Sequence, residues 1–136
     1  MIDPPTRCPC RKKSETTTYA KCCEPYHAGR AVAPTAEALM RSRYAAYALG
    51  KADYLLATWH PSTRPADFAL NADQQWLLLR VQGTTTDADR ATVEFTARSR
   101  QGGRDHVLHE VSRFVREAGR WYYVDGDLSW AAPRKP

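Results

Sequence analysis

Residues 91–97 read Ala-Thr-Val-Glu-Phe-Thr-Ala, with apolar side chains at every second position. A period of two is typical of a β-strand that has one face on a core and the other in water. This stretch therefore predicts a half-buried strand, and the segments around it decide the kind of sheet to which it belongs.

The flanking sequence predicts antiparallel hairpins on both sides of this strand. Gly102-Gly103 and Glu117-Ala118-Gly119 are typical of tight turns. The expected strands are Trp76–Gln82, Ala91–Ala97, His106–Arg116 and Arg120–Asp127. Along the third of these, Leu108, Glu110 and Phe114 share one face, whereas Val107, Val111 and Val115 share the other.

The chain ahead of the strands predicts helices. Thr35 is a suitable N-cap for a first helix that ends at Gly50, and a second helix is expected over Lys51–Trp59. Residues 61–74 predict a loop, with one helical turn around Ala66–Leu70. Helices followed by a run of hairpin strands indicate an α+β fold. A curved antiparallel sheet wrapped around the first helix leaves a cavity, which is the natural place for a ligand.

The cysteines gather at the N-terminus, as Cys8-Pro9-Cys10 and Cys22-Cys23. Clustered thiols suit tetrahedral Zn²⁺, and we expect Cys8, Cys10, Cys22 and Cys23 to bind it. Two alternatives remain open at this point: four unrelated free cysteines, or His27 in place of one thiolate. Residues 1–33 contain little apolar surface, so a metal is needed to organise them. We therefore expect a zinc-binding segment over residues 1–33 and an α+β domain over residues 34–136.

The net charge of +5 suggests nucleic-acid binding, but its distribution weakens this interpretation. Residues 34–136 carry fourteen Lys and Arg against twelve Asp and Glu, interspersed along the chain. Nucleic acid is therefore an unlikely partner. The sequence contains no long apolar run and no secretory signal, so we expect no membrane partner and a cytoplasmic location.

Catalytic chemistry is not evident in the pattern. The titratable candidates are His60, His106, His109, Glu110, Asp125 and Asp127. Glu110 lies among apolar residues, where it is either a base or one half of an ion pair with Arg43 or Arg113. We expect Arg43 and Glu110 to lie within salt-bridge range, provided that Leu108 and Phe114 face inward.

Several segments resemble a known family. The two cysteine pairs, with Tyr19-Ala20-Lys21 and Pro25-Tyr26-His27-Ala28-Gly29, resemble the SEC-C zinc motif found at the C-terminus of the SecA translocation motor. Residues 35–44 and 53–65, with Glu110-Val111-Ser112-Arg113-Phe114 and residues 120–126, resemble the YchJ family of bacterial proteins. The resemblance implies a SEC-C-like segment followed by a nuclear transport factor 2-like (NTF2-like, cystatin-like) domain, and the same four cysteines as zinc ligands. The stretch Arg11–Lys21 is longer than the motif's usual form and lacks its glycines. We expect metal binding to survive, since lengthening a loop costs little entropy.

Two function classes follow. The first is an interaction or adaptor protein whose zinc segment docks on a protein partner; the resemblance implies export or translation machinery. The second is a small-molecule binder or enzyme that uses the cavity. A cavity filled by Met40, Tyr44, Phe95 and Trp121 favours the first class, and an open cavity with convergent polar groups favours the second.

Overall fold

The computed structural model describes residues 7–10 and 18–131. It confirms the α+β fold: a short 3₁₀ helix and three α-helices precede four strands. The 3₁₀ helix η1 spans Tyr19–Lys21, and the α-helices are α1 (Glu24–His27), α2 (Ala36–Leu49) and α3 (Ala52–Ala57). The strands are β1 (Gln74–Asp87), β2 (Arg90–Gln101), β3 (Arg104–Glu117) and β4 (Arg120–Ala131).

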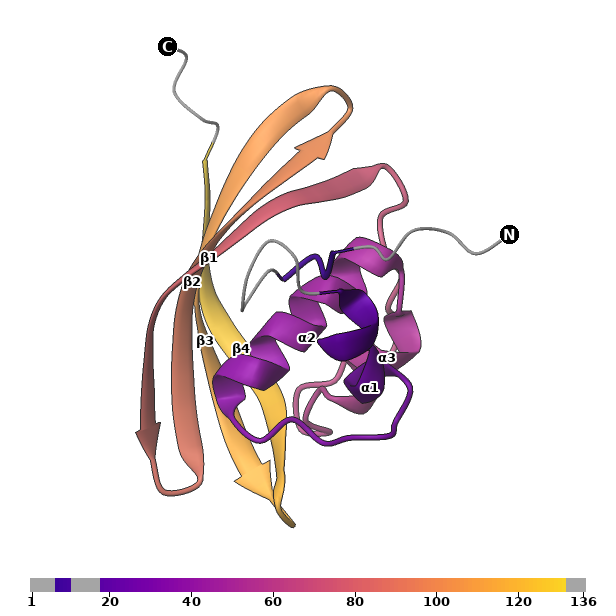
Figure 1. The fold of residues 1–136 in the computed structure, drawn as a ribbon. Coiled ribbons are helices and arrows are strands. Elements are labelled where there is room, and N and C mark those ends of the chain that lie inside the picture. The colour runs from indigo at the N-terminus through magenta and orange to yellow at the C-terminus, as the bar shows by residue number, and fades with distance from the viewer. Residues whose placement is uncertain (1–6, 11–17, 132–136) are drawn as a thin grey trace, which may run out of the picture.

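The four strands form one antiparallel sheet in the order β1-β2-β3-β4. Each strand is longer than predicted, although β4 begins at Arg120 as expected. β1 gains the most, because residues 83–87 continue to pair with residues 90–94 of β2. The sheet is strongly curved, and the helices lie on its concave side (Figure 1). The curvature places a cavity, described below, between α2 and the sheet.

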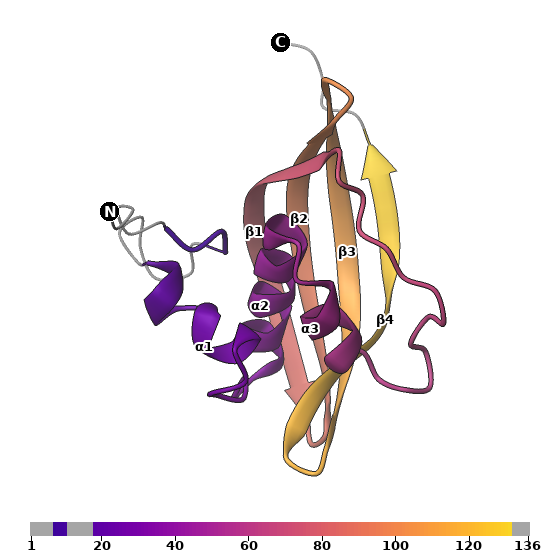
Figure 2. The same ribbon diagram turned by 90° about the vertical axis from the view of Figure 1, so that its right-hand side faces the viewer.

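Helix α2 has the predicted ends. The Thr35 side chain accepts a hydrogen bond from the Ala38 backbone N–H at 3.0 Å, which caps the first turn. Gly50 ends the helix in the left-handed region, with φ of +76°, where a side chain would be strained. Figure 2 shows α2 and α3 in front of the sheet, with α1 beside α2.

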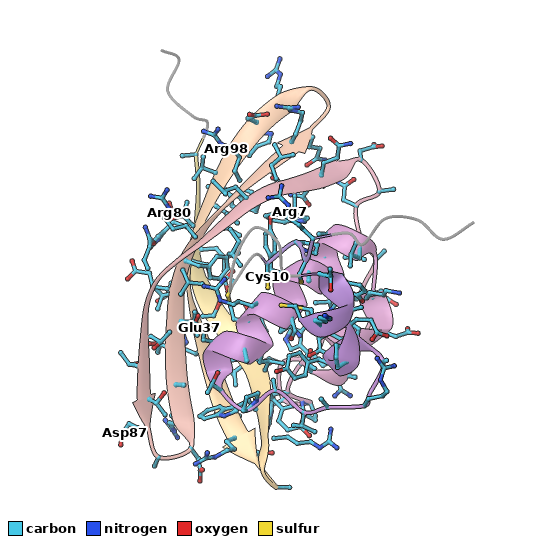
Figure 3. All side chains as sticks on the ribbon, viewed as in Figure 1. Arg7, Cys10, Glu37, Arg80, Asp87 and Arg98 are labelled. Carbon is cyan, nitrogen blue, oxygen red and sulfur yellow. The ribbon has the colours of Figure 1, made fainter. Side chains whose placement is uncertain are left out.

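The inward face of β3 carries Leu108, Glu110, Ser112 and Phe114, all buried. The valines of the same strand are half-buried on the opposite face. Arg80 and Arg98, on β1 and β2, are exposed and project from the sheet on the side away from the helices (Figure 3). The expected inward facing of Leu108 and Phe114 is therefore confirmed.

One local prediction is wrong. Residues 66–70 form no helical turn and run as bends and irregular backbone. The end of α3 is instead held by β4: His60 N–H donates to the Tyr123 carbonyl at 2.8 Å, and Tyr123 N–H donates to the Thr58 carbonyl at 2.9 Å. Within the described residues, no helix is long and apolar enough to span a membrane.

Candidate metal centre and adjoining cavity

The four cysteines come together at the N-terminal end of the fold. Cys8 and Cys10 lie on one described segment, Cys22 follows η1, and Cys23 caps α1. Their sulfur atoms all lie within 4.8 Å of one another, and no other described group of three or more metal-ligating side chains does so. Residues 11–17 of the lengthened loop lie outside the described residues, so their effect on the metal stays a prediction.

The sulfur separations fit a tetrahedral metal. Cys10 Sγ lies 3.7 Å from Cys8, 3.4 Å from Cys22 and 3.6 Å from Cys23, and the Cys22 and Cys23 sulfurs are 3.9 Å apart. Four thiolates around one Zn²⁺ at the usual bond length have sulfurs about 3.8 Å apart. All four cysteines are free, and Cys22 is the one that is not fully buried. The donor set is therefore that of a closed, structural metal site.

The thiols influence one another's protonation. The hydrogen bond with Cys10 lowers the pKa of Cys8 to about 2, whereas burial raises the pKa of Cys22 to about 12. The hydrogen bond with Cys10 also raises the pKa of Cys23 above its ordinary value. Without a cation the cluster therefore retains protons, and a metal must displace them to bind.

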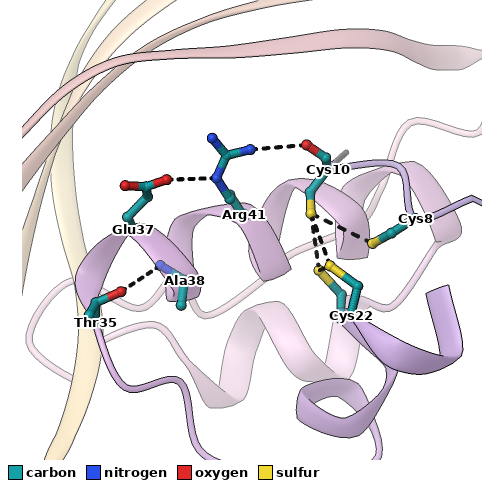
Figure 4. A network of polar contacts seen from close by, with 8 residues as sticks. Cys8, Cys10, Cys22, Thr35, Glu37, Ala38 and Arg41 are labelled. Atoms are coloured by element: carbon teal, nitrogen blue, oxygen red, sulfur yellow. Dashed lines mark hydrogen bonds and ion pairs between the residues drawn. The ribbon is translucent and has the colours of Figure 1, made fainter. Parts of the chain in front are cut away.

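Helix α2 fastens the cysteine segment to the domain (Figure 4). Arg41 donates from its guanidinium NH1 group to the Cys10 carbonyl at 3.0 Å, and its Nε donates to Glu37 at 2.8 Å. The guanidinium is thus held one turn after Glu37 and beside the thiol cluster. Four thiolates and one divalent metal together carry a net negative charge. A guanidinium that bonds to the backbone of one ligand residue partly offsets that charge.

His27 occupies a different position from the one left open by the sequence. Its Nε2 donates to the Ser42 carbonyl of α2 at 2.7 Å, and its Nδ1 accepts from the Tyr19 hydroxyl at 2.6 Å, which is the neutral tautomer that satisfies both partners. Burial lowers the pKa of His27. The ring therefore joins α1 to α2, and it is not part of the group of four sulfurs.

A second feature lies on the other side of α2. A cavity of about 410 Å³ is bounded by α2, the end of α3 and the concave face of the sheet. Its inner wall is buried and includes Met40, Tyr44, Phe95, Leu108 and Phe114. Its rim includes Leu128 and Trp130, each about half exposed at 52% and 51%. Met40, Tyr44 and Phe95 thus line the cavity without filling it, and Trp121 lies outside its lining.

The predicted ion pair between Arg43 and Glu110 is absent from the salt bridges of the described residues. Arg43 instead donates to the Leu55 carbonyl at 2.8 Å and to Thr58 Oγ1 at 2.6 Å. Its guanidinium carbon lies 4.6 Å from the centroid of the Tyr123 ring, and the Tyr123 hydroxyl donates to Glu110 Oε2 at 3.0 Å. Tyr123 therefore connects the two buried groups, which both line the cavity.

The other titratable candidates do not line this cavity. His60 contacts Glu117 at 2.9 Å and His109 contacts Glu94 at 2.7 Å. Asp125 and Asp127 pair with Arg113, at 2.5 and 3.0 Å. Of the six candidates, only Glu110 combines burial with a place in the cavity wall.

The contacts that hold Glu110 in the cavity wall were not predicted from the sequence. Ser112 Oγ donates to Glu110 Oε2 at 2.6 Å. Gly126, on β4, faces the same oxygen, and a Cβ built on it would lie 2.4 Å from Glu110 Oε2. The only signal in the sequence was the i, i+2 spacing of Glu110 and Ser112, which places both on one strand face.

The fold and the cysteine cluster define a class: an NTF2-like α+β domain with an N-terminal cysteine segment of the kind that binds metal. Residues 35–126 match the family model described as the middle NTF2-like domain of YchJ. A UPF0225 protein of Bordetella parapertussis is 53% identical over 128 residues, covering 91% of this chain and 94% of the relative. A UPF0225 protein of Xanthomonas campestris is 54% identical over 126 residues, covering 90% and 95%. The chain belongs to the YchJ family. The two relatives described above carry the name UPF0225.

Two solved structures share the fold. A SEC-C motif containing protein from Rhodopseudomonas palustris is 40% identical, with a TM-score of 0.74 over 85% of this chain and 94% of that one. A SEC-C motif containing protein from Psychrobacter arcticus is 30% identical, with a TM-score of 0.73 over 93% and 84%. The resemblance to the SEC-C motif is thus shared with proteins of known structure.

Proposed function

We propose that this chain is a structural zinc protein whose α+β domain binds a small molecule. The zinc proposal is supported by four sulfur atoms within 4.8 Å of one another. Soft thiolate donors in a closed tetrahedral set favour Zn²⁺ over harder cations such as Mg²⁺. Cys8, Cys10, Cys22 and Cys23 hold the metal, and its role is to fold the N-terminal segment onto α2.

Metal analysis tests this assignment. Protein purified without chelator contains one zinc per chain, and replacing Cys22 and Cys23 together with serine removes it. His27→Gln is the matched control, because His27 bonds to Tyr19 and Ser42 and is not a ligand. Full zinc content in the double variant, or its loss in the His27 variant, contradicts the ligand set.

The small-molecule proposal is carried by the open cavity of about 410 Å³. Its wall is mostly apolar and aromatic, yet it includes the buried polar side chains of Arg43, Glu110 and Ser112. Apolar pockets of this size with a few convergent polar groups are typical of small-molecule sites. The same side chains would be costly to bury if the space were merely a packing defect.

The test is to close the cavity and leave the fold intact. Leu128→Trp narrows the rim at a position that is 52% exposed, and Leu78→Trp is the control on the outer face, at 46% exposed. Screening a library of small molecules by thermal shift yields compounds that stabilise the parent protein and the control. The same compounds leave the melting temperature of Leu128→Trp unchanged. Equal shifts in all three proteins place the binding elsewhere.

A second candidate function is docking of the metal segment on a protein partner of the export or translation machinery. It is favoured by exposed side chains on that segment, including Lys21, Arg30 and Val32, the last 46% exposed. If the partner belongs to the translation machinery, the zinc-loaded protein co-sediments with purified ribosomes. The double variant Lys21→Glu, Arg30→Glu then no longer co-sediments. Both functions are proposed for the cytoplasm, where thiols stay reduced.

A further inference from the structure

Glu110 defines the polar end of the cavity. It is 6% exposed, and the hydrogen bonds that it accepts from Ser112 and Tyr123 both end at Oε2. Gly126 leaves space for the same oxygen, since a Cβ at that position would lie 2.4 Å from it. No hydrogen bond from the described part of the chain reaches Oε1. Glu110 lines the cavity, and its Oε1 is not among the enclosed unpaired polar atoms of the described residues, so this oxygen is open to a donor. A ligand that brings an N–H or O–H group can bond to it directly.

Trp59 supplies a second unpaired polar group. Its ring lines the cavity, and its buried indole N–H has no acceptor among the described residues. It is the sole buried side-chain nitrogen or oxygen of the described chain in that condition. Because this nitrogen is enclosed by protein atoms, a molecule in the cavity meets the Trp59 ring rather than its N–H, and Glu110 Oε1 is the acceptor that the wall presents.

The charge of the cavity is already balanced. Arg43 is 5% exposed, and its guanidinium is held by Leu55 and Thr58 and lies 5.1 Å from the centroid of the Trp59 ring. This cation offsets the Glu110 carboxylate across the Tyr123 ring. A ligand with a net charge would enter an apolar site without a counter-ion, at a high desolvation cost. A neutral ligand avoids it.

The remaining walls suit a flat ring. The Trp76 ring, from β1, lies 5.8 Å from the Tyr44 ring and 6.4 Å from the Trp130 ring, measured between centroids. Because Trp130 comes from β4, the two edge strands of the sheet meet at the cavity rim through aromatic side chains. Ring edges and faces at these distances accept another aromatic ring in stacked or edge-on contact.

We propose that the cavity binds a neutral, planar, ring-containing molecule with an N–H or O–H donor that bonds to Glu110 Oε1. This rests on the proposed small-molecule function and specifies its ligand class. Glu110 then binds the ligand, and Ser112, Tyr123 and Gly126 position its carboxyl group.

Matched probes test the donor. 2-Quinolinone is a flat, neutral bicycle with one N–H and one carbonyl, and N-methyl-2-quinolinone lacks only the N–H. Binding to the zinc-loaded, full-length protein is followed by the indole N–H signals of Trp59, Trp76 and Trp130 in NMR spectra. Trp121, which lies outside the cavity lining, is the internal control. N-methylation lowers the affinity by about ten-fold or more, since the site's acceptor then stays unpaired.

The variant Glu110→Gln is a second test, because it is expected to remove or reverse the preference for 2-quinolinone over N-methyl-2-quinolinone. The Gln carbonyl accepts from Ser112 and Tyr123, so its NH₂ group takes the place of Oε1 and turns an acceptor into a donor. The variant binds N-methyl-2-quinolinone at least as well as 2-quinolinone. Glu94→Gln, on the outer face beside His109, keeps the original preference.

The outcomes separate the two levels of the proposal. Equal affinity of the two probes for the parent protein, or tighter binding of the charged 2-naphthoate, overturns the ligand class and leaves small-molecule binding standing. An unchanged preference in Glu110→Gln likewise removes Glu110 as the anchor. If neither quinolinones nor naphthoate shift any of the three cavity indoles, the proposed small-molecule function fails as well.

Discussion

Gly126 of β4 lies opposite Ser112 of β3 and is a diagonal neighbour of Glu110. The Glu110 carboxyl group fits inside the sheet's concave face because a Cβ at this diagonal position would lie 2.4 Å from Oε2, and glycine has none. The burial of Glu110 is compensated by two hydroxyl donors, from Ser112 and Tyr123. Burial raises the pKa of Tyr123 above its ordinary value, which keeps this hydroxyl protonated and able to donate. The polar end of the cavity is thus built from four residues of β3 and β4.

Gly126→Ala is expected to lower the free energy of unfolding by about 1–3 kcal/mol, because the new Cβ would lie 2.4 Å from Glu110 Oε2 and force a shift. Gly83→Ala is the control within β1, where an added Cβ meets nothing within 4 Å. Urea denaturation of the two variants measures the difference. Similar midpoints for both would show that Glu110 moves aside freely.

The cysteine cluster predicts a pH dependence. Burial raises the pKa of Cys22 to about 12, so this thiol must lose a proton when zinc binds near neutral pH. Lower pH favours the protonated, metal-free form of the thiols, and zinc affinity therefore decreases as the pH is lowered. Competition with a chromogenic chelator between pH 8 and pH 6 should show a fall of about ten-fold per pH unit for each proton released. A flat profile would mean that the metal does not displace thiol protons.

At the scale of single elements, helix α2 contacts the metal segment with one face and lines the cavity with another. Arg41 and the Ser42 carbonyl hold the metal segment, whereas Met40, Arg43, Tyr44 and Tyr47 line the cavity. The helix start and stop were readable from Thr35 and Gly50, since capping chemistry is local. Its contacts were not, because Cys10 and Leu55 reach it only through the tertiary fold.

Arg41→Met is expected to weaken zinc binding by about ten-fold, as loss of an outer partner of a metal ligand typically does. The variant loses the hydrogen bond to the Cys10 carbonyl and the nearby positive charge, but keeps an unbranched apolar stem. Arg30→Met removes another arginine of the same region, exposed and paired with Glu24, and is the control. The rate of zinc transfer to a chelator should rise in the first variant alone.

The strands show what periodicity reveals and what it leaves out. Alternation over residues 91–97 located β2 and, with the turns, the antiparallel order. Residues 83–87 read Gly-Thr-Thr-Thr-Asp and carry no apolar alternation, so their pairing with β2 had no local signal. The cysteine cluster could be predicted because its members are close neighbours in the sequence. The cavity was expected from the curved sheet, but its polar lining was not, since Trp59, Glu110 and Tyr123 meet only when β4 pairs with the end of α3.

For the whole molecule, the boundary between residues 1–33 and 34–136 stays a prediction, and the core shows what separation would cost. Cys8, Cys10, Cys23 and Ala33 belong to the same buried cluster as Leu39 and the sheet residues. Most of the buried apolar side chains nevertheless lie beyond residue 34. Residues 34–131 therefore carry most of the core, and side chains of the N-terminal segment complete the same cluster.

Deleting residues 1–33 is expected to leave a protein that unfolds cooperatively at a lower temperature, because Leu39 loses its cover. Chelation of the full chain should disorder the N-terminal segment and preserve the amide dispersion of residues 35–131. Thermal unfolding and NMR spectra measure the two effects. Collapse of the whole spectrum on chelation would show that the two parts fold as one unit.

Because one helix separates the metal segment from the cavity, the two sites share a wall. Thermodynamic linkage makes any interaction between them reciprocal: if bound zinc changes ligand affinity by some factor, bound ligand changes zinc affinity by that same factor. Arg41 and Arg43 lie two residues apart on α2, one held by the Cys10 carbonyl and the other by the end of α3. Any shift of α2 moves both arginines together, so we expect zinc and a ligand of the cavity to change each other's affinity.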